Sequence, residues 1–174
     1  MNTGQMMITV GAIMLLTLVI LRVNNNFLST NVVLMRSKFG ILAVSLATSV
    51  IEEANSKAFD AKSDTSGVNN LNLLTAPNLL GPEGGEVYPN FNDFDDFNGL
   101  TFDTEDDSTF LSAVFDVICK VEYVEDTNPD VAVGTRTWHK KITVTITSES
   151  MRDLSTNKLD TLRMSSVFSY WFYR

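Results

Sequence analysis

Apolar residues are concentrated at the start of the chain, where no charged residue interrupts positions 6–21. The stretch from Gln5 to Phe59 contains no proline, and its only glycines are Gly11 and Gly40. Proline and glycine are the residues that fit a helix interior least well. The pattern therefore predicts one long helix from Gln5 to Phe59.

The two halves of this predicted helix differ in polarity. At about 1.5 Å per residue, positions 5–23 are about 28 Å long, close to the roughly 30 Å of a bilayer's hydrocarbon core. Three consecutive asparagines, Asn24 to Asn26, follow as a weak point, because asparagine is a poor helix former. In positions 24–60, apolar residues recur at steps of three and four, at Phe39, Leu42, Leu46 and Val50. We expect the first half to cross a membrane and the amphipathic second half to pack on a partner.

The remaining positions, 61–174, are predicted to form one globular head. The segment from Asp60 to Gly67 is polar and is expected to form the helix exit and a loop. Leu71, Leu73 and Leu74 are expected to form a short turn or strand that covers the helix. With about 115 residues, the head is long enough for one small domain but not for two.

Alternation of apolar and polar residues with a period of two predicts strands in the second part of the head. The predicted strands are Val114 to Val124, Thr137 to Ser148 and Leu162 to Tyr173, and Asn128-Pro129-Asp130 predicts a turn. The sequence thus predicts an α+β fold. One long N-terminal helix packs on a three- to four-stranded antiparallel sheet within positions 111–173.

An acidic loop precedes the predicted sheet. Positions 83–107 hold nine acidic residues and no basic residue, with phenylalanines interleaved. One interpretation is a Ca²⁺ site, since Ca²⁺ takes about six to eight oxygen ligands, and the candidate ligands are Asp93, Asp95, Asp96 and Asn98. The other interpretation is a solvated loop whose phenylalanines pack on the core while the acids face water. No other cofactor is predicted.

Composition narrows the classes of function. The net charge is −8 and the isoelectric point is near 4.5, so nucleic acid is not an expected partner, because a phosphate backbone requires a basic surface. The single cysteine, Cys119, and the single histidine, His139, are predicted on opposite faces of their strands. Nothing in the sequence places the histidine beside a nucleophile, and no zinc or phosphate-binding motif is present. We therefore predict that the protein is not an enzyme.

The N-terminus favours a retained segment over a removable signal peptide. A signal peptide begins with basic residues, whereas positions 1–5 contain no lysine or arginine. An ordinary signal anchor is a second alternative. The nearby basic residues, Arg22, Arg36 and Lys38, all follow the apolar run, and the positive-inside rule taken alone would place the head in the cytoplasm.

A short polar leader that ends in glycine, Met1 to Gly4, followed directly by a long apolar helix, resembles the prepilin family of type IV pilins, minor pilins and type II secretion pseudopilins. The resemblance implies that a prepilin peptidase cuts after Gly4, so that Gln5 becomes the first mature residue. It also implies an inner-membrane anchor with an extracytoplasmic head, which assembles with copies of itself or with other pilin-like subunits. Thr9 stands where the family usually has a glutamate. The positions expected to lie in the membrane and then in the filament are Met6, Met7, Ile8, Thr9, Ile13, Leu16 and Ile20.

Two further segments resemble minor pilins of the mannose-sensitive haemagglutinin type. The end of the helix, Leu46 to Ala54 followed by Lys57 to Asp60, is similar to their L-A-x-S-(apolar)-(apolar)-E-E-A…K-x-F-D pattern. The acidic loop is similar to their D-D-x-D-D-(aromatic)-x-G loop at Asp93, Asp95, Asp96, Phe97, Asn98 and Gly99.

Together these patterns predict a structural subunit of a type IV pilus-like or type II secretion-like filament. The alternative is a single-pass, membrane-anchored envelope protein that does not polymerise and binds a ligand through the loop of phenylalanines and aspartates. The two alternatives differ in what covers the apolar half of the helix.

Overall fold

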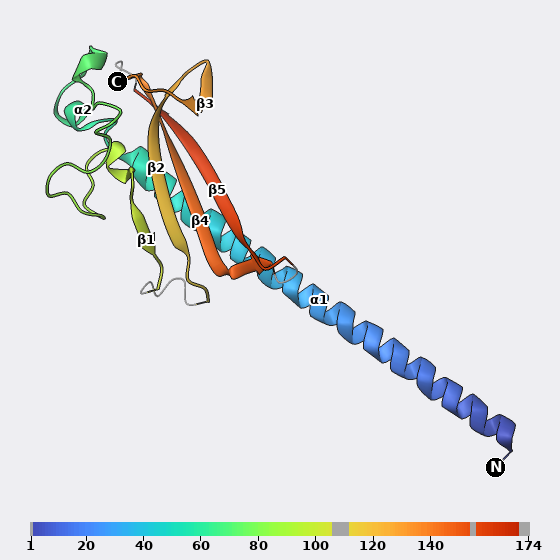
Figure 1. Cartoon of the computed structure of the whole chain (residues 1–174). Helices are drawn as coiled ribbons and strands as arrows, with labels where there is room; N and C mark the ends of the chain where they lie inside the picture. Colours follow the sequence, from blue (N-terminus) through green and yellow to red (C-terminus); the bar gives the residue numbers. More distant parts are fainter. Residues whose placement is uncertain (1, 106–111, 154–155, 171–174) are drawn as a thin grey trace. The chain divides into compact units, whose positions relative to one another are not determined.

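A computed structural model describes residues 2–105, 112–153 and 156–170 of the chain (Figure 1). The chain forms two compact units, which divide between Lys38 and Phe39. The helices are α1 (Thr3–Ser56) and α2 (Ala61–Thr65), with 3₁₀ turns η1 (Leu71–Leu73) and η2 (Asp95–Phe97). The strands are β1 (Thr101–Asp103), β2 (Asp116–Glu125), β3 (Asn128–Ala132), β4 (His139–Asp153) and β5 (Lys158–Ser169).

Helix α1 confirms the prediction of one long N-terminal helix. It is a single α-helix from Thr3 to Ser56, and it continues without a break through Asn24 to Asn26. The predicted end at Phe59 is wrong, because the backbone of Ala58 pairs with the acidic loop instead of continuing the helix. Ala58 N donates to Asn92 O at 3.3 Å, and Ala58 O accepts from Phe94 N at 2.8 Å. A long-range contact therefore ends the helix three residues early.

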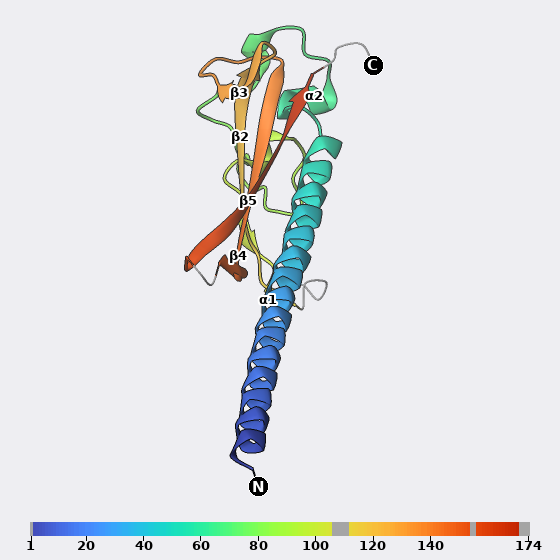
Figure 2. The same cartoon turned by 90° about the vertical axis from the view of Figure 1, so that its right-hand side faces the viewer.

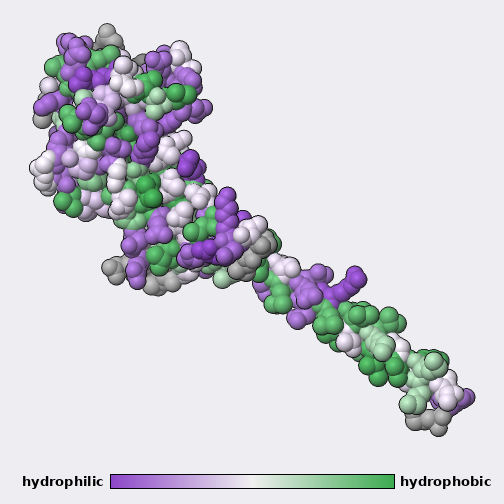
Figure 3. Space-filling model, viewed as in Figure 1, coloured by the Kyte–Doolittle hydropathy of each residue, from purple (hydrophilic) through white to green (hydrophobic). Residues whose placement is uncertain are grey.

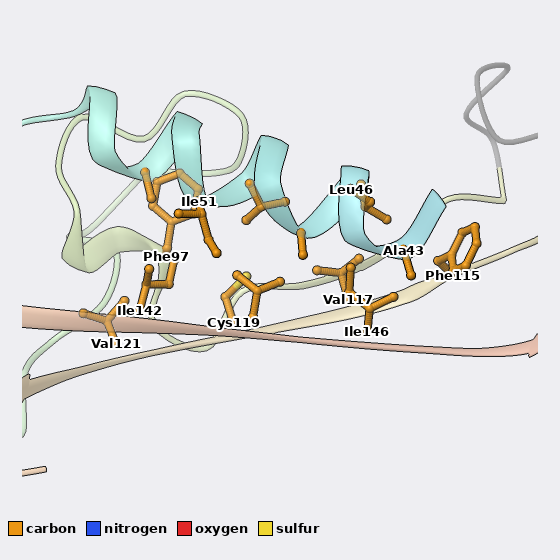
Figure 4. Close-up of a cluster of buried hydrophobic side chains, with 14 of the residues drawn as sticks. Ala43, Leu46, Ile51, Phe97, Phe115, Val117, Cys119, Val121, Ile142 and Ile146 are labelled. Atoms are coloured by element: carbon orange, nitrogen blue, oxygen red, sulfur yellow. The ribbon is translucent and has the colours of Figure 1, made fainter. Parts of the chain in front are cut away.

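The second half of α1 packs on one face of the sheet (Figure 2). Leu42 is half-buried, and the buried helix residues recur at steps of three and four: Phe39, Ala43, Leu46, Ala47, Val50, Ile51 and Ala54. Figure 4 shows Leu46 and Ile51 in the layer between the helix and strands β2 and β4. The prediction that this half packs on a partner is confirmed, and the partner is the chain's own sheet.

Within the described residues, the sheet is antiparallel and has five strands, in the order β1-β2-β4-β5 with β3 paired to β2. The predicted α+β layout is confirmed, although the predicted number of three to four strands is too low. Alternation is as predicted from Asp116 to Tyr123 and from His139 to Ser148, where the residues of one parity are buried and those of the other parity are exposed or half-buried. Cys119 of β2 lies opposite Val144 of β4 in the register, and both are buried.

Three local predictions in the head are wrong. Asn128-Pro129-Asp130 is not a turn but the start of β3, and the turn lies at Asp126-Thr127. The segment after Asp60 is not only a loop, because Asp60 caps the short helix α2 through a bond from Lys62 N to its Oδ1 at 3.2 Å. The last strand begins at Lys158, before the predicted Leu162, and its predicted end at 171–173 lies outside the described residues.

Candidate functional site

The first half of α1 presents a continuous apolar surface, which we call the apolar segment (Met6–Leu21). Its large side chains are 47% to 77% exposed, with Val10 at the lower limit and Met7 at the upper. The most apolar 18-residue window of α1 has a mean hydropathy of 2.4, and the helix is long and apolar enough to cross a membrane. Figure 3 shows hydrophobic residues over the surface of this half of the helix. The exposed set is Met6, Met7, Ile8, Val10, Ile13, Met14, Leu15, Leu16, Leu18, Val19, Ile20 and Leu21.

Polar atoms inside the apolar segment are satisfied by the helix itself. The hydroxyl of Thr9 donates to Met6 O at 2.9 Å and lies 3.2 Å from Gln5 O. Thr17 donates to Ile13 O at 2.9 Å in the same way. Unsatisfied polar groups are costly in hydrocarbon, so these internal bonds make the segment compatible with lipid or with an apolar protein core.

The predicted processing site lies in the first turn of the helix. Gly4 and Gln5 are both helical, and Gln5 N donates to Asn2 O at 3.0 Å. Apart from the neighbouring residues and the helix's own backbone, no atom of the described residues lies within 4 Å of where a side chain on Gly4 would begin. Cleavage after Gly4 stays a prediction.

The acidic loop does not have the predicted solvated arrangement at its centre. Phe91, Phe94 and Phe97 are buried, as expected, but Asp93, Asp95 and Asp96 are buried with them at 0% exposure. Asp93 Oδ1 accepts from Asp95 N at 2.8 Å and from Asp96 N at 3.3 Å, which fixes the start of η2. The expectation that these acids face water is therefore wrong, because the loop folds around them. Asp106 and Asp107 lie outside the described residues.

A buried lysine, Lys140, offsets part of the negative charge of these buried aspartates. Lys140 Nζ donates to Asp60 Oδ2 at 3.0 Å, to Phe59 O at 2.7 Å and to Asp95 Oδ1. The side chains of all three charged residues are 0% to 1% exposed. The ammonium group lies 4.6 Å from the ring centre of Phe59, which adds a cation–π contact. We call Lys140, Asp60, Asp95 and the adjacent Asp93 the ion cluster.

Sequence reasoning missed Lys140, although a signal was present. Lys140 has the same parity as Ile142, Val144 and Ile146, which the alternation of β4 assigns to the buried face. Strand periodicity alone therefore places a lysine on the core side of the sheet. A lysine is almost never fully buried without a partner, so the pattern implied a carboxylate nearby but not which one.

Burial raises the pKa of two carboxyl groups in the ion cluster, those of Asp93 and Asp95. Burial, together with the neighbouring negative charges of Asp95 and Asp96, raises the pKa of Asp93 to about 8. Burial also raises the pKa of Asp95, an effect that the charge of Lys140 opposes. As carboxylates, Asp93 and Asp95 each leave Oδ2 buried without a hydrogen-bond partner among the described residues. A proton on Asp93 resolves this, since the carboxyl group of Asp93 can then donate to that of Asp95.

The four residues of the predicted Ca²⁺ loop do not form one set of free oxygens. Both atoms of the Asn98 amide are occupied, since Nδ2 donates to Leu80 O at 2.9 Å and Oδ1 accepts from Val121 N at 3.0 Å. Asp95 is paired with Lys140. Among the described residues, the group of side chains that could hold a cation is Glu83, Glu86 and Asp96, whose ligand oxygens lie within 4.8 Å of one another. Burial, a hydrogen bond with Glu86 and the charges of nearby acids raise the pKa of Glu83 to about 7.

The histidine and the cysteine do not form a catalytic pair. Cys119 is buried under α1, and burial raises the pKa of its thiol to about 12. His139 is half-buried rather than fully exposed, and its Nδ1 lies 2.7 Å from Ser169 Oγ. In the described part of the chain, no carboxylate is hydrogen-bonded to the other ring nitrogen.

No protein-family model matches the chain, and no curated protein or solved structure matches it. Its function is therefore inferred from the apolar segment, the head and the resemblance of its motifs.

Proposed function

We propose that the protein is a structural subunit of a pilin-like filament, as a pilin, minor pilin or pseudopilin, held in the inner membrane by its apolar segment before assembly. The observation that carries the proposal is the unbroken helix α1. Its second half is part of the head's core, while its first half leaves twelve large apolar side chains exposed. This division gives one helix two partners, the chain's own sheet and an apolar environment outside the chain.

The size of the exposed surface supports a permanent partner for the apolar segment. Burying one large aliphatic side chain contributes about 1.5–3 kcal/mol, so covering even half of this set contributes on the order of 10 kcal/mol. Lipid can supply that cover for a single chain. In a filament, the helices of neighbouring subunits supply it instead.

Thr9 constrains how such a filament would be held together. The family's usual glutamate at this position carries a charge that requires a partner on a neighbouring subunit. The Thr9 hydroxyl is satisfied within its own helix, by the carbonyls of Met6 and Gln5. Assembly would therefore rest on apolar packing of the segment without an ion pair at this position.

The test is the intact mass and N-terminal sequence of the protein recovered from native membranes and from sheared surface material. We expect a chain that begins at Gln5 and that is present in the sheared fraction. A chain that begins at Met1 and occurs only in membranes would overturn the proposal and favour the anchored binding protein.

A matched pair of variants sharpens this test. Gly4→Leu should block processing, whereas Gly11→Leu should not. The fold tolerates both, since among the described residues neither glycine has an atom outside its own helix within 4 Å of the added carbon. If the two variants are processed equally, cleavage does not depend on Gly4 and the processing assignment fails.

A further inference from the structure

The ion cluster places an amine and three carboxyl groups together in a site that water does not reach. Lys140 Nζ lies within hydrogen-bond distance of Asp60 and Asp95, and the side chains of all three residues are 0% to 1% exposed. The walls are aromatic, with the rings of Phe59 and Tyr123 centred 4.6 and 5.5 Å from the ammonium nitrogen. This combination of a buried amine, a buried carboxyl group and proton carriers is what amide formation between side chains requires.

We propose that Lys140 and Asp95 become joined by an intramolecular isopeptide bond, formed by the folded chain itself with Asp60 and Asp93 as proton carriers. The bond links η2 in the acidic loop to β4, across 45 positions of sequence. This inference concerns the head alone and does not depend on the proposed filament function.

The geometry brings the reacting atoms together before any reaction. Lys140 Nζ contacts the Asp95 carboxyl group directly, and both groups are fixed by the packing around them. Holding reactants in contact, at about 3–3.5 Å, replaces a slow bimolecular encounter with a unimolecular step. The reactive forms are the neutral amine and the carboxylic acid, which proton transfer to Asp60 and from Asp93 produces within the cluster.

The protons and electrons of the step balance within the cluster. Asp60 Oδ2, 3.0 Å from Nζ, takes one ammonium proton and frees the nitrogen lone pair. The amine attacks Cγ of Asp95, and the electron pair of the carbonyl bond moves to oxygen. A second proton then leaves the nitrogen. This proton and the one taken by Asp60 are carried to one oxygen of the Asp95 carboxyl group. The bond between that oxygen and Cγ breaks, and the oxygen leaves as water. The ammonium and the carboxylate together yield one amide and one water, and Asp60 and Asp93 return to their starting states.

Asp93 is placed to act as the acid in this step. In the part of the chain that the structure describes, the buried Oδ2 atoms of Asp93 and Asp95 have no other hydrogen-bond partner. The carboxyl group of Asp93 carries its proton at neutral pH, because burial and the adjacent acids raise its pKa to about 8. It can therefore polarise the Asp95 carboxyl group and then protonate the departing oxygen.

The carboxyl group of Asp95 is a better target for attack by the amine than that of Asp60. Both oxygens of Asp60 are occupied, since Oδ1 accepts from Lys62 N at 3.2 Å and Oδ2 accepts from Thr75 N at 2.9 Å as well as from Lys140. Loss of an oxygen from Asp60 would remove one of these backbone bonds. Asp95 Oδ2 accepts from no backbone donor within residues 2–105, 112–153 and 156–170, so its departure as water leaves none of these backbone groups unpaired.

The experiment uses the full-length chain purified in detergent, denatured and then measured by mass spectrometry. We expect an intact mass lower than that of the unlinked chain by one water, and a protease digest in which the peptides containing Lys140 and Asp95 are joined. Peptide mapping separates this loss from any processing at the N-terminus. Recovery of the two peptides unlinked from folded protein would overturn the proposal, and a link to Asp60 would overturn the choice of acceptor.

Two variants test the assigned roles. Lys140→Arg keeps the positive charge but removes the amine, so the chain should have its full mass. Asp93→Asn keeps the oxygen that accepts from the backbone of Asp95 and Asp96 but cannot donate the acid proton, so the linked fraction should fall sharply. Protection of the buried Cys119 thiol from a labelling reagent reports folding of each variant. Complete linkage in folded Asp93→Asn would refute the role of Asp93.

Discussion

Met14→Asp is the substitution that most directly tests the role of the apolar segment. Met14 is the central residue of the predicted membrane span at positions 5–23, and its side chain is 64% exposed. The substitution therefore removes little packing within the chain, and the head should fold normally. A carboxylate at the centre of a membrane helix costs about 2.5–3.5 kcal/mol on insertion scales. That cost corresponds to a factor of roughly 70 to 400 in an equilibrium constant.

The same cost has different consequences in the two environments of the segment. The other large apolar side chains outweigh it in lipid, since each contributes about 1.5–3 kcal/mol when it is buried. We therefore expect Met14→Asp to remain in the membrane fraction. In a bilayer, water and local thinning relieve part of this cost, whereas in a filament every subunit would bury an unpaired carboxylate among packed apolar helices, so the sheared fraction should contain much less of the variant than of the wild type.

The assay is immunoblotting of membrane and sheared fractions, with two controls. Met14→Leu keeps an apolar side chain of similar volume and should behave as the wild type. Val131→Asp adds the same charge to the head, where Val131 of β3 is 54% exposed, and should leave the membrane fraction unchanged. Wild-type amounts of Met14→Asp in sheared filaments would refute the reasoning, because the segment could not then be packed in an apolar core.

Three further predictions concern the head. Ile142→Ala, at a fully buried position, should lower the free energy of unfolding by about 2–5 kcal/mol, whereas Ile118→Ala should cost less than about 1 kcal/mol. Ile118 is 52% exposed on the same sheet, and equal urea midpoints for the two variants would contradict the assigned faces. The Cys119 thiol, whose pKa burial raises to about 12, should react with a thiol reagent only after denaturation, and rapid labelling of native protein would contradict its burial. The folded-state pKa of Glu83 lies above the ordinary 4.5, at about 7, so its contribution to stability is present below pH 4.5 and is lost as the pH rises through 7. Melting temperatures between pH 4.5 and 8 should therefore fall less steeply in Glu83→Gln than in the wild type, and parallel profiles would show that Glu83 is not perturbed.

Elements that depend on local periodicity were predictable from the sequence. The long helix follows from the absence of helix breakers between Gln5 and Ser56, and its buried stripe follows from apolar residues at steps of three and four. The alternation in β2 and β4 follows from the period of two, which is a property of each strand alone. The exposed apolar segment also follows from composition, because no polar face is present that could turn toward water.

Element ends and edge pairings were not predictable in this way. Helix α1 ends at Ser56 because the backbone of Ala58 pairs with Asn92 and Phe94, which are more than thirty positions away. Strand β3 contains Pro129 and was predicted as part of a turn, but it pairs with β2 at an edge, where proline is tolerated. The end of α1 and the pairing of β3 both depend on contacts with other segments of the chain, which a local sequence pattern does not identify.

The sequence by itself determined that a long apolar helix precedes an α+β head and that Lys140 has the parity of the core face. Only the tertiary structure decided that Asp60 and Asp95, 80 and 45 positions from Lys140, meet its ammonium group inside the head. The physical reason is that a buried charge is stable only with a partner of opposite charge. That partner comes from a part of the chain that is distant in sequence and that only the folded structure brings close. A dense run of aspartates is therefore interpreted from the sequence as a solvated surface, but it forms a buried ionic cluster once the strand that carries its lysine is in place.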